Sequence, residues 1–137
     1  MEHSAVIKSA HHGTTLEFTD RTRWHYRMIL SGPNFHGDCV VYAYEPASQL
    51  TAFFRDMANK SRGWEGVKEW SSLERELKLA ATIDSTGHIG LAVRLRPVPS
   101  GTDWVISANL LLKAGQLNGM AFQVEKFMGI WPTDSDS

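Results

Sequence analysis

Alternating apolar and polar positions mark a series of short strands in the first third of the chain. Ala5 to Ser9 and Thr14 to Thr19 flank a His-His-Gly turn, and Trp24 to Leu30 keeps one apolar face at a period of two residues. A turn cluster with Gly and Pro separates these strands from Cys39 to Tyr44, which is apolar on both faces. We therefore predict four N-terminal strands, with the last of them in a central position.

A period of three to four residues marks two helices. The first is predicted from Ala47 to Asn59, because Pro46 suits a first helical turn and an apolar stripe follows it. The second starts near Ala114 and has a stripe of its own. The stripes consist of Leu50, Phe53, Phe54 and Met57 in the first helix and Leu117, Met120, Ala121, Val124 and Met128 in the second.

The second half of the chain alternates more regularly. Residues 76–83, 88–96 and 104–112 each present one apolar face, and a turn at 84–87 and a Pro-Gly loop at 97–101 connect them. Short connections predict an antiparallel meander. The sheet needs a cover and the helices need a surface to pack on, so we predict an α+β fold. In it, two helices pack on one face of a mainly antiparallel sheet of about six to seven strands, as a two-layer sandwich.

Composition is consistent with one globular domain. The 137 residues are 42% hydrophobic and 21% charged, with a formal net charge of −1. We assign residues 1–132 to a single domain and expect the polar tail 133–137 to be disordered. The balanced charge gives no bulk attraction to nucleic acid, which is therefore not the favoured partner.

The sequence predicts a cytoplasmic protein. Cys39 is the only cysteine, so no internal disulfide can form, and this favours a reducing compartment. The N-terminus has no basic region followed by an apolar one, and no apolar run approaches the length that spans a bilayer. We expect no membrane association, and homo-oligomerisation stays open.

An aromatic and charged segment from Arg62 to Glu74 is the most distinctive part of the chain. Its two Trp residues and its Arg are the types that most often anchor binding hot spots, and its glycines allow tight turns. The alternative is that both Trp residues pack at the margin of the core while the charges remain solvated. The partner-binding residues predicted here are Trp64, Glu65, Lys68, Glu69, Trp70 and Glu74.

No pattern in the chain predicts a catalytic or metal site. A helical segment would place Glu65 and Glu69 on one face, but Lys68 between them would neutralise a carboxylate pair. Six histidines are scattered, and one cysteine cannot supply the usual zinc spacing. The common Gly-rich phosphate loops and the Gly-x-Ser-x-Gly nucleophile motif are missing. We predict no cofactor, and a metal-dependent hydrolase built from histidines gathered in space remains an alternative.

Basic side chains stand opposite the apolar faces of several strands. Arg27, Arg94 and Arg96 are the main ones, with Lys78 nearby in phase. If these strands share one sheet, its outer face would be locally basic and could take an anionic ligand or a nucleic-acid backbone. The alternative is an ordinary solvated face.

The string Gly63-Trp64-x-Gly66-x-Lys68-x-Trp70 and the later Asp84-x-x-Gly87-His88 resemble the DUF6228 family of short bacterial proteins of unknown function. The likeness covers about the last 75 residues well and the N-terminal half loosely. The resemblance implies a small bacterial protein with a sheet, two helices and no assigned activity. It carries over no functional residue.

Together these features favour a non-enzymatic binding protein. We expect a bacterial immunity or defence-associated protein that neutralises a toxin or another defence component by direct contact, because an aromatic and charged segment occurs without a catalytic constellation. A small-ligand or nucleic-acid binder that uses the basic sheet face is the alternative.

Overall fold

Eight strands and two helices form the fold seen in the computed structural model, which describes residues 4–43, 47–97 and 104–129. The strands form two antiparallel four-stranded meanders in chain order. The first comprises β1 (Ala5–Lys8), β2 (Thr15–Thr19), β3 (His25–Gly32) and β4 (Phe35–Tyr42). The second comprises β5 (Lys68–Ser71), β6 (Leu77–Ile83), β7 (His88–Leu95) and β8 (Ile106–Lys113). The helices are α1 (Ala47–Asn59) and α2 (Leu117–Gly129), the latter entered through a 3₁₀ turn, η1 (Ala114–Gln116).

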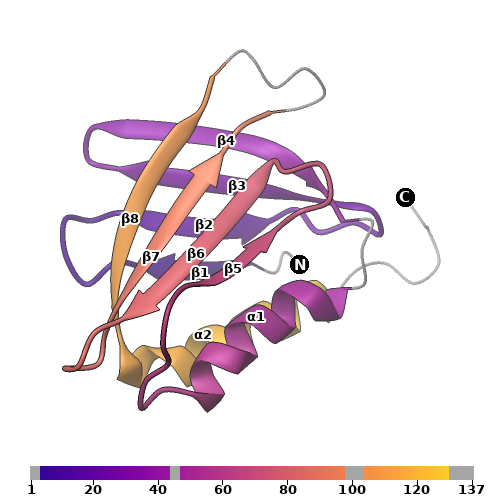
Figure 1. Ribbon diagram of the computed structural model, residues 1–137. Helices are drawn as coiled ribbons and strands as arrows, with labels where there is room; N and C mark the ends of the chain where they lie inside the picture. The colour runs from indigo at the N-terminus through magenta and orange to yellow at the C-terminus, as the bar shows by residue number, and fades with distance from the viewer. Residues whose placement is uncertain (1–3, 44–46, 98–103, 130–137) are drawn as a thin grey trace.

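The two sheets face each other with their strands crossing, and the helix pair closes the space between them on one side (Figure 1). All the sheet faces turned inward and both helix stripes share one apolar core. Phe18 of β2 contacts both helices within this core. Its ring centroid lies 6.2 Å from that of Phe54 in α1 and 5.8 Å from that of Phe127 in α2.

The α+β class, the antiparallel pairing and both helices are confirmed, but the sheet arrangement was predicted wrongly. Eight strands replace the expected six to seven, and they form two sheets instead of one sheet with both helices on one face. The additional strand is β5, within the aromatic and charged segment. Alternation shows which face of a strand is buried but not which strands share a sheet, so it could not separate the meanders.

The central position predicted for the Cys39 strand is also wrong. Among the described strands, β4 pairs only with β3 and is an edge strand of its sheet. Val40, whose presence made both faces apolar, is 43% exposed, whereas Cys39 and Val41 on either side of it are buried. An edge strand can leave one apolar side chain in solvent at little cost.

Some predictions fall outside the described residues. These are Pro46, most of the loop at 97–101 and the tail 133–137. Within the described part of the chain, no helix is both long and apolar enough to cross a membrane.

Candidate functional site

The outer face of the β5–β8 sheet, turned away from the other sheet, is built by cross-strand register. Ser71 of β5 pairs with Lys78 of β6, Lys78 pairs with Arg94 of β7, and Arg94 pairs with Ser107 of β8. Residues paired across an antiparallel sheet point to the same face, so these four side chains form one line across all four strands. We call this line the basic row.

A second line runs beside the basic row, two residues away from it on each strand. It consists of Glu69, Ala80, Ala92 and Asn109. The two alanines are small, and the longer side chains on either side rise above them. The result is an open hollow of about 600 Å³ whose lining includes both lines. Pockets for small molecules commonly have this size.

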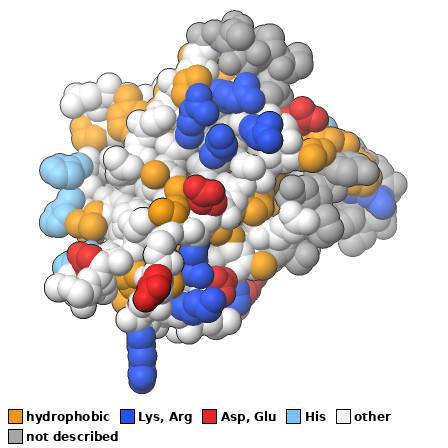
Figure 2. All heavy atoms as spheres, in the orientation of Figure 1, with side chains coloured by type: hydrophobic (Ala, Val, Ile, Leu, Met, Phe, Trp, Pro, Cys, Tyr) orange, Lys and Arg blue, Asp and Glu red, His pale blue; other side chains and the backbone are white. Residues whose placement is uncertain are grey.

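Positive charge gathers at one end of this face (Figure 2). Lys78 and Arg94 are exposed, and within the described residues neither has a carboxylate within ion-pair distance. Arg96 continues the same side of β7, because its N–H donates to the carbonyl of Glu76 at 2.9 Å, next to the Lys78–Arg94 pair. Exposed Arg75 lies in the turn that precedes β6.

Two cations directly opposite each other in a sheet repel and destabilise it. Some cations in the described chain have an acidic partner, as Arg27, Arg55 and Lys68 do. Among the described residues the directly opposed Lys78–Arg94 pair has none within ion-pair distance, so an anion bound in the hollow would relieve the repulsion. Ser71, Ser107 and Asn109 would add neutral hydrogen-bonding groups around it.

The aromatic and charged segment does not form a single contact surface. Trp64 is half-buried against the core, and its indole N–H donates to the carbonyl of Ala81 at 3.3 Å. The ammonium of Lys68 pairs with Asp56 of α1 and lies 5.2 Å from the centroid of the Trp64 ring. Only 17% of the Lys68 side chain is exposed. Through these contacts, Trp64 and Lys68 attach β5 to β6 and to α1.

Trp70 also packs against the core, and its indole nitrogen is buried without a hydrogen-bond partner among the described residues. Glu65, Glu69 and Glu74 are exposed. The helical spacing considered for Glu65 and Glu69 is not formed, because Gly66 has φ of +76° and Glu69 lies on β5. The predicted residues therefore divide into inward-facing anchors and outward-facing acids.

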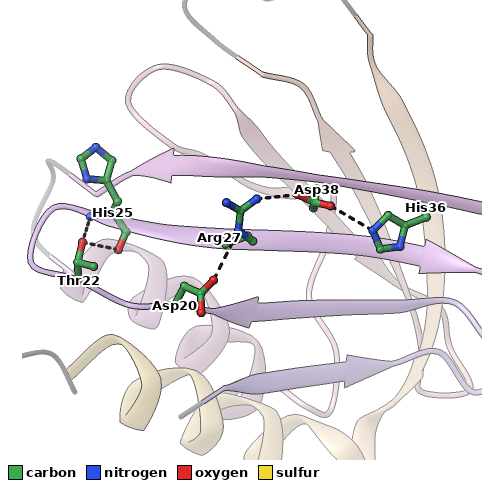
Figure 3. Close-up of polar contacts among 6 residues, drawn as sticks. All are labelled: Asp20, Thr22, His25, Arg27, His36 and Asp38. Carbon is green, nitrogen blue, oxygen red and sulfur yellow. Dashed lines mark hydrogen bonds and ion pairs between the residues drawn. The ribbon is translucent and has the colours of Figure 1, made fainter. Parts of the chain in front are cut away.

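Arg27 lies on the other sheet, away from Arg94 and Arg96. On β3, its guanidinium contacts the Asp38 carboxylate at 2.6 Å and the Asp20 carboxylate at 3.5 Å (Figure 3). Asp38 in turn contacts Nε2 of His36 at 3.1 Å. Arg27 is thus neutralised within a polar chain on the outer face of its own sheet. The three arginines predicted for one anion site do not meet.

No described group of three or more His, Cys, Asp or Glu side chains could hold a metal ion. Cys39 is buried, and its thiol lies 3.5 Å from the carbonyl oxygen of Arg96. Burial, together with the carboxylates of Glu76 and Asp38, raises the pKa of this thiol to about 11. A thiol with so high a pKa is a poor nucleophile at neutral pH.

The model of a family of unknown function, DUF6228, matches residues 7–130. The chain belongs to this family. The match extends the resemblance noted in the sequence to the N-terminal sheet as well. No curated protein matches the chain.

Sequence reasoning placed Lys78, Arg94 and Arg96 in phase but did not find Ser71, Ser107 or Asn109. Each of these stands at an outward position of its strand. They lie beside the cations because of the pairing between strands, and the sequence of one strand does not determine that pairing. Ser71 could have been placed only if β5 had been predicted as a strand.

Proposed function

We propose that this DUF6228 protein is a non-enzymatic binding protein whose contact surface is the hollowed outer face of the β5–β8 sheet. The observation that carries the proposal is the Lys78–Arg94 pair at the rim of a hollow of about 600 Å³. These two exposed cations are in direct cross-strand register, and among the described residues neither has a carboxylate within ion-pair distance. Such a face takes a carboxylate or another compact anionic group. The exposed carboxylate of Glu69 in the same hollow would repel a long polyanion. A protein partner with a single acidic side chain therefore fits better than nucleic acid.

A bacterial immunity or defence-associated role suits such a surface. A protein that neutralises a toxin or defence component by covering it needs a rigid complementary face and no catalytic group. The exposed acids Glu65, Glu69 and Glu74 lie on or beside β5 and would form the rim of the contact, where charges mainly affect the association rate.

The test is affinity capture from the native cell with three proteins. These are the wild type, the Lys78→Glu/Arg94→Glu double variant, and a matched control, Lys8→Glu/Lys126→Glu, which changes the charge equally at exposed positions elsewhere. We expect a partner of the wild type to be retained by the control and lost from the first variant. Equal capture by all three proteins contradicts the proposal.

The volume of the hollow also favours a second candidate, a small anionic ligand. Titration with citrate and with inorganic phosphate, followed by the shift in melting temperature, tests it directly. A saturable stabilisation of the wild type that the Lys78→Glu/Arg94→Glu variant lacks would identify a small-ligand site. A wild type that shows no shift leaves the protein partner as the proposal to test.

A further inference from the structure

The outer faces of the two sheets differ in how their polar side chains are paired. On the β1–β4 sheet, the guanidinium of Arg27 contacts the Asp38 carboxylate at 2.6 Å, and that carboxylate contacts Nε2 of His36 at 3.1 Å (Figure 3). The hydroxyls of Thr15 and Ser31 on the same face lie 3.3 Å apart in a hydrogen bond. These polar groups already have partners within the chain.

The hollow on the β5–β8 sheet has the opposite arrangement. Its polar side chains make no hydrogen bond and no ion pair with any other residue of the described chain. They are those of Glu69, Ser71, Lys78, Arg94, Ser107 and Asn109. Several unpaired polar groups that converge on one hollow are typical of a ligand site, because a ligand supplies the partners that the chain lacks.

Both signs of charge are present in this hollow. Lys78 and Arg94 pair across β6 and β7, and Glu69 of β5 pairs with Ala80, two residues along β6 from Lys78. Glu69 is therefore the diagonal neighbour of Lys78, and such positions are about 7–8 Å apart. Within the described residues, no ion pair joins the Glu69 carboxylate to the Lys78 ammonium. Each charge remains available to a ligand.

The floor beside these charges is apolar. Ala80 and Ala92 lie directly opposite each other on β6 and β7, between Glu69 and the end of the second line on β8. Their methyl groups leave room above the sheet and offer apolar surface to the methylene groups of a ligand. The hollow thus joins a cationic end and an anionic end through a short apolar floor.

We infer that the hollow binds a bipolar group. Its carboxylate contacts Lys78 and Arg94, and its ammonium or guanidinium contacts Glu69, with the two charges about 6–8 Å apart. This ligand class rests on the proposed function, since both concern the same surface, and Glu69 supplies the second charge. A simple anion is repelled by Glu69, whereas a bipolar group has a partner at each end.

Two sources present this charge pair to the hollow. On an extended strand of a protein partner, side chains two residues apart point to the same side at a spacing of about 7 Å, so an acid and a base at those positions match. A free ω-amino acid is the other source. In extended δ-aminovalerate, the ammonium and the carboxylate are about 6–7 Å apart.

NMR titrations with small probes, followed through the amide shifts of β5 to β7, test this ligand class. δ-Aminovalerate carries both charges, whereas valerate and pentylamine have the same chain length and carry only the acid or only the base. We expect the wild type to bind δ-aminovalerate at least about threefold more tightly than valerate or pentylamine. Glycine should bind no better than valerate, because its two charges are too close together to reach both ends of the hollow.

Substitution of the acid separates the two ends. Glu69→Gln should weaken δ-aminovalerate binding by about two- to fivefold, the effect of one exposed ion pair, without weakening valerate binding. The matched control is Glu17→Gln, which removes an acid from the outer face of the other sheet and should change neither affinity. Lys78→Glu/Arg94→Glu should lose both probes, because it removes the cations that hold the carboxylate.

A short blocked peptide with Glu and Lys two positions apart distinguishes the sources. Tighter binding of this peptide than of δ-aminovalerate assigns the charge pair to a strand of a protein partner, and weaker binding assigns it to a free small molecule. Equal binding of δ-aminovalerate and valerate, binding of neither, or full δ-aminovalerate binding by Glu69→Gln overturns the bipolar ligand. The proposed function fails separately, through partner capture that Lys78→Glu/Arg94→Glu leaves unchanged.

Discussion

Glu76 accepts a hydrogen bond at 2.8 Å from the main-chain N–H of Tyr42, and this contact joins the two sheets. The carboxylate also accepts from Oγ of Ser72 at 2.6 Å, and only 1% of Glu76 is exposed. A buried polar group must be paired to be tolerated, and here both donors depend on one side chain.

Glu76→Ala should therefore destabilise the fold by about 2–4 kcal/mol, because it removes the acceptor that joins the Tyr42 N–H to the other sheet and that pairs the buried Ser72 hydroxyl. Glu76→Gln keeps one acceptor oxygen and should cost less than Glu76→Ala. Urea denaturation of the two variants and the wild type measures the difference. A loss below about 0.5 kcal/mol for Glu76→Ala would show that the sheets are held together without this contact.

The turn between β6 and β7 contains a carboxylate with a strongly lowered pKa. Asp84 accepts from the Thr86 hydroxyl at 2.7 Å, from the His88 N–H at 3.0 Å and from the Thr86 N–H at 2.8 Å. The Thr86 hydroxyl contributes most, and together these bonds lower the pKa of Asp84 from 3.8 to about 2.

A lowered pKa means that folding favours the ionised form. The contribution of Asp84 to stability is thus present above pH 3.8 and is lost as the pH falls toward 2. We expect an NMR titration of the Asp84 carboxyl with a midpoint near 2, and Thr86→Ala should move that midpoint upward. An unchanged midpoint in Thr86→Ala would contradict the role given to the hydroxyl.

The helices and most strands could be predicted from the sequence because their patterns are local. The stripe from Leu50 to Met57 needs only helical geometry, and α1 begins and ends at the predicted residues, Ala47 and Asn59. The turn at 84–87 likewise depends on adjacent residues, with Gly87 supplying a φ of +85°.

β5 was missed because only one of its two inward positions is apolar. Lys68 and Trp70 face inward on this strand, and a lysine at an inward position breaks the expected alternation. Its charge is accommodated by Asp56, twelve residues earlier and on a helix. The basic row likewise depends on pairing between residues that are distant in the sequence. Ser71 could not be assigned to this row until β5 was known to be a strand.

Cys39 should be inert toward alkylation in the folded protein. Burial first, and the nearby carboxylates of Glu76 and Asp38 second, raise the pKa of its thiol from 9.0 to about 11. At pH 8, iodoacetamide should label Cys39 only after denaturant unfolds the chain, which mass spectrometry can follow. The thiol also contributes stability below pH 9.0 that is lost as the pH rises toward 11. Rapid labelling under native conditions would contradict the buried position.

Lys68 should act as an anchor for β5 and not as a binding residue. Its ammonium pairs with Asp56, whose pKa is lowered chiefly by this contact, and it lies over the Trp64 ring. Lys68→Ala removes both contacts and should cost about 1–2 kcal/mol, whereas Lys68→Met keeps the apolar stem and should cost less. Amide exchange locates the effect: the inward N–H of Trp70 should exchange faster in Lys68→Ala, while amides in β7 stay protected. Exchange that rises equally in β5 and β7 would mean that Lys68 supports the whole sheet, and the anchor would then not be local to β5.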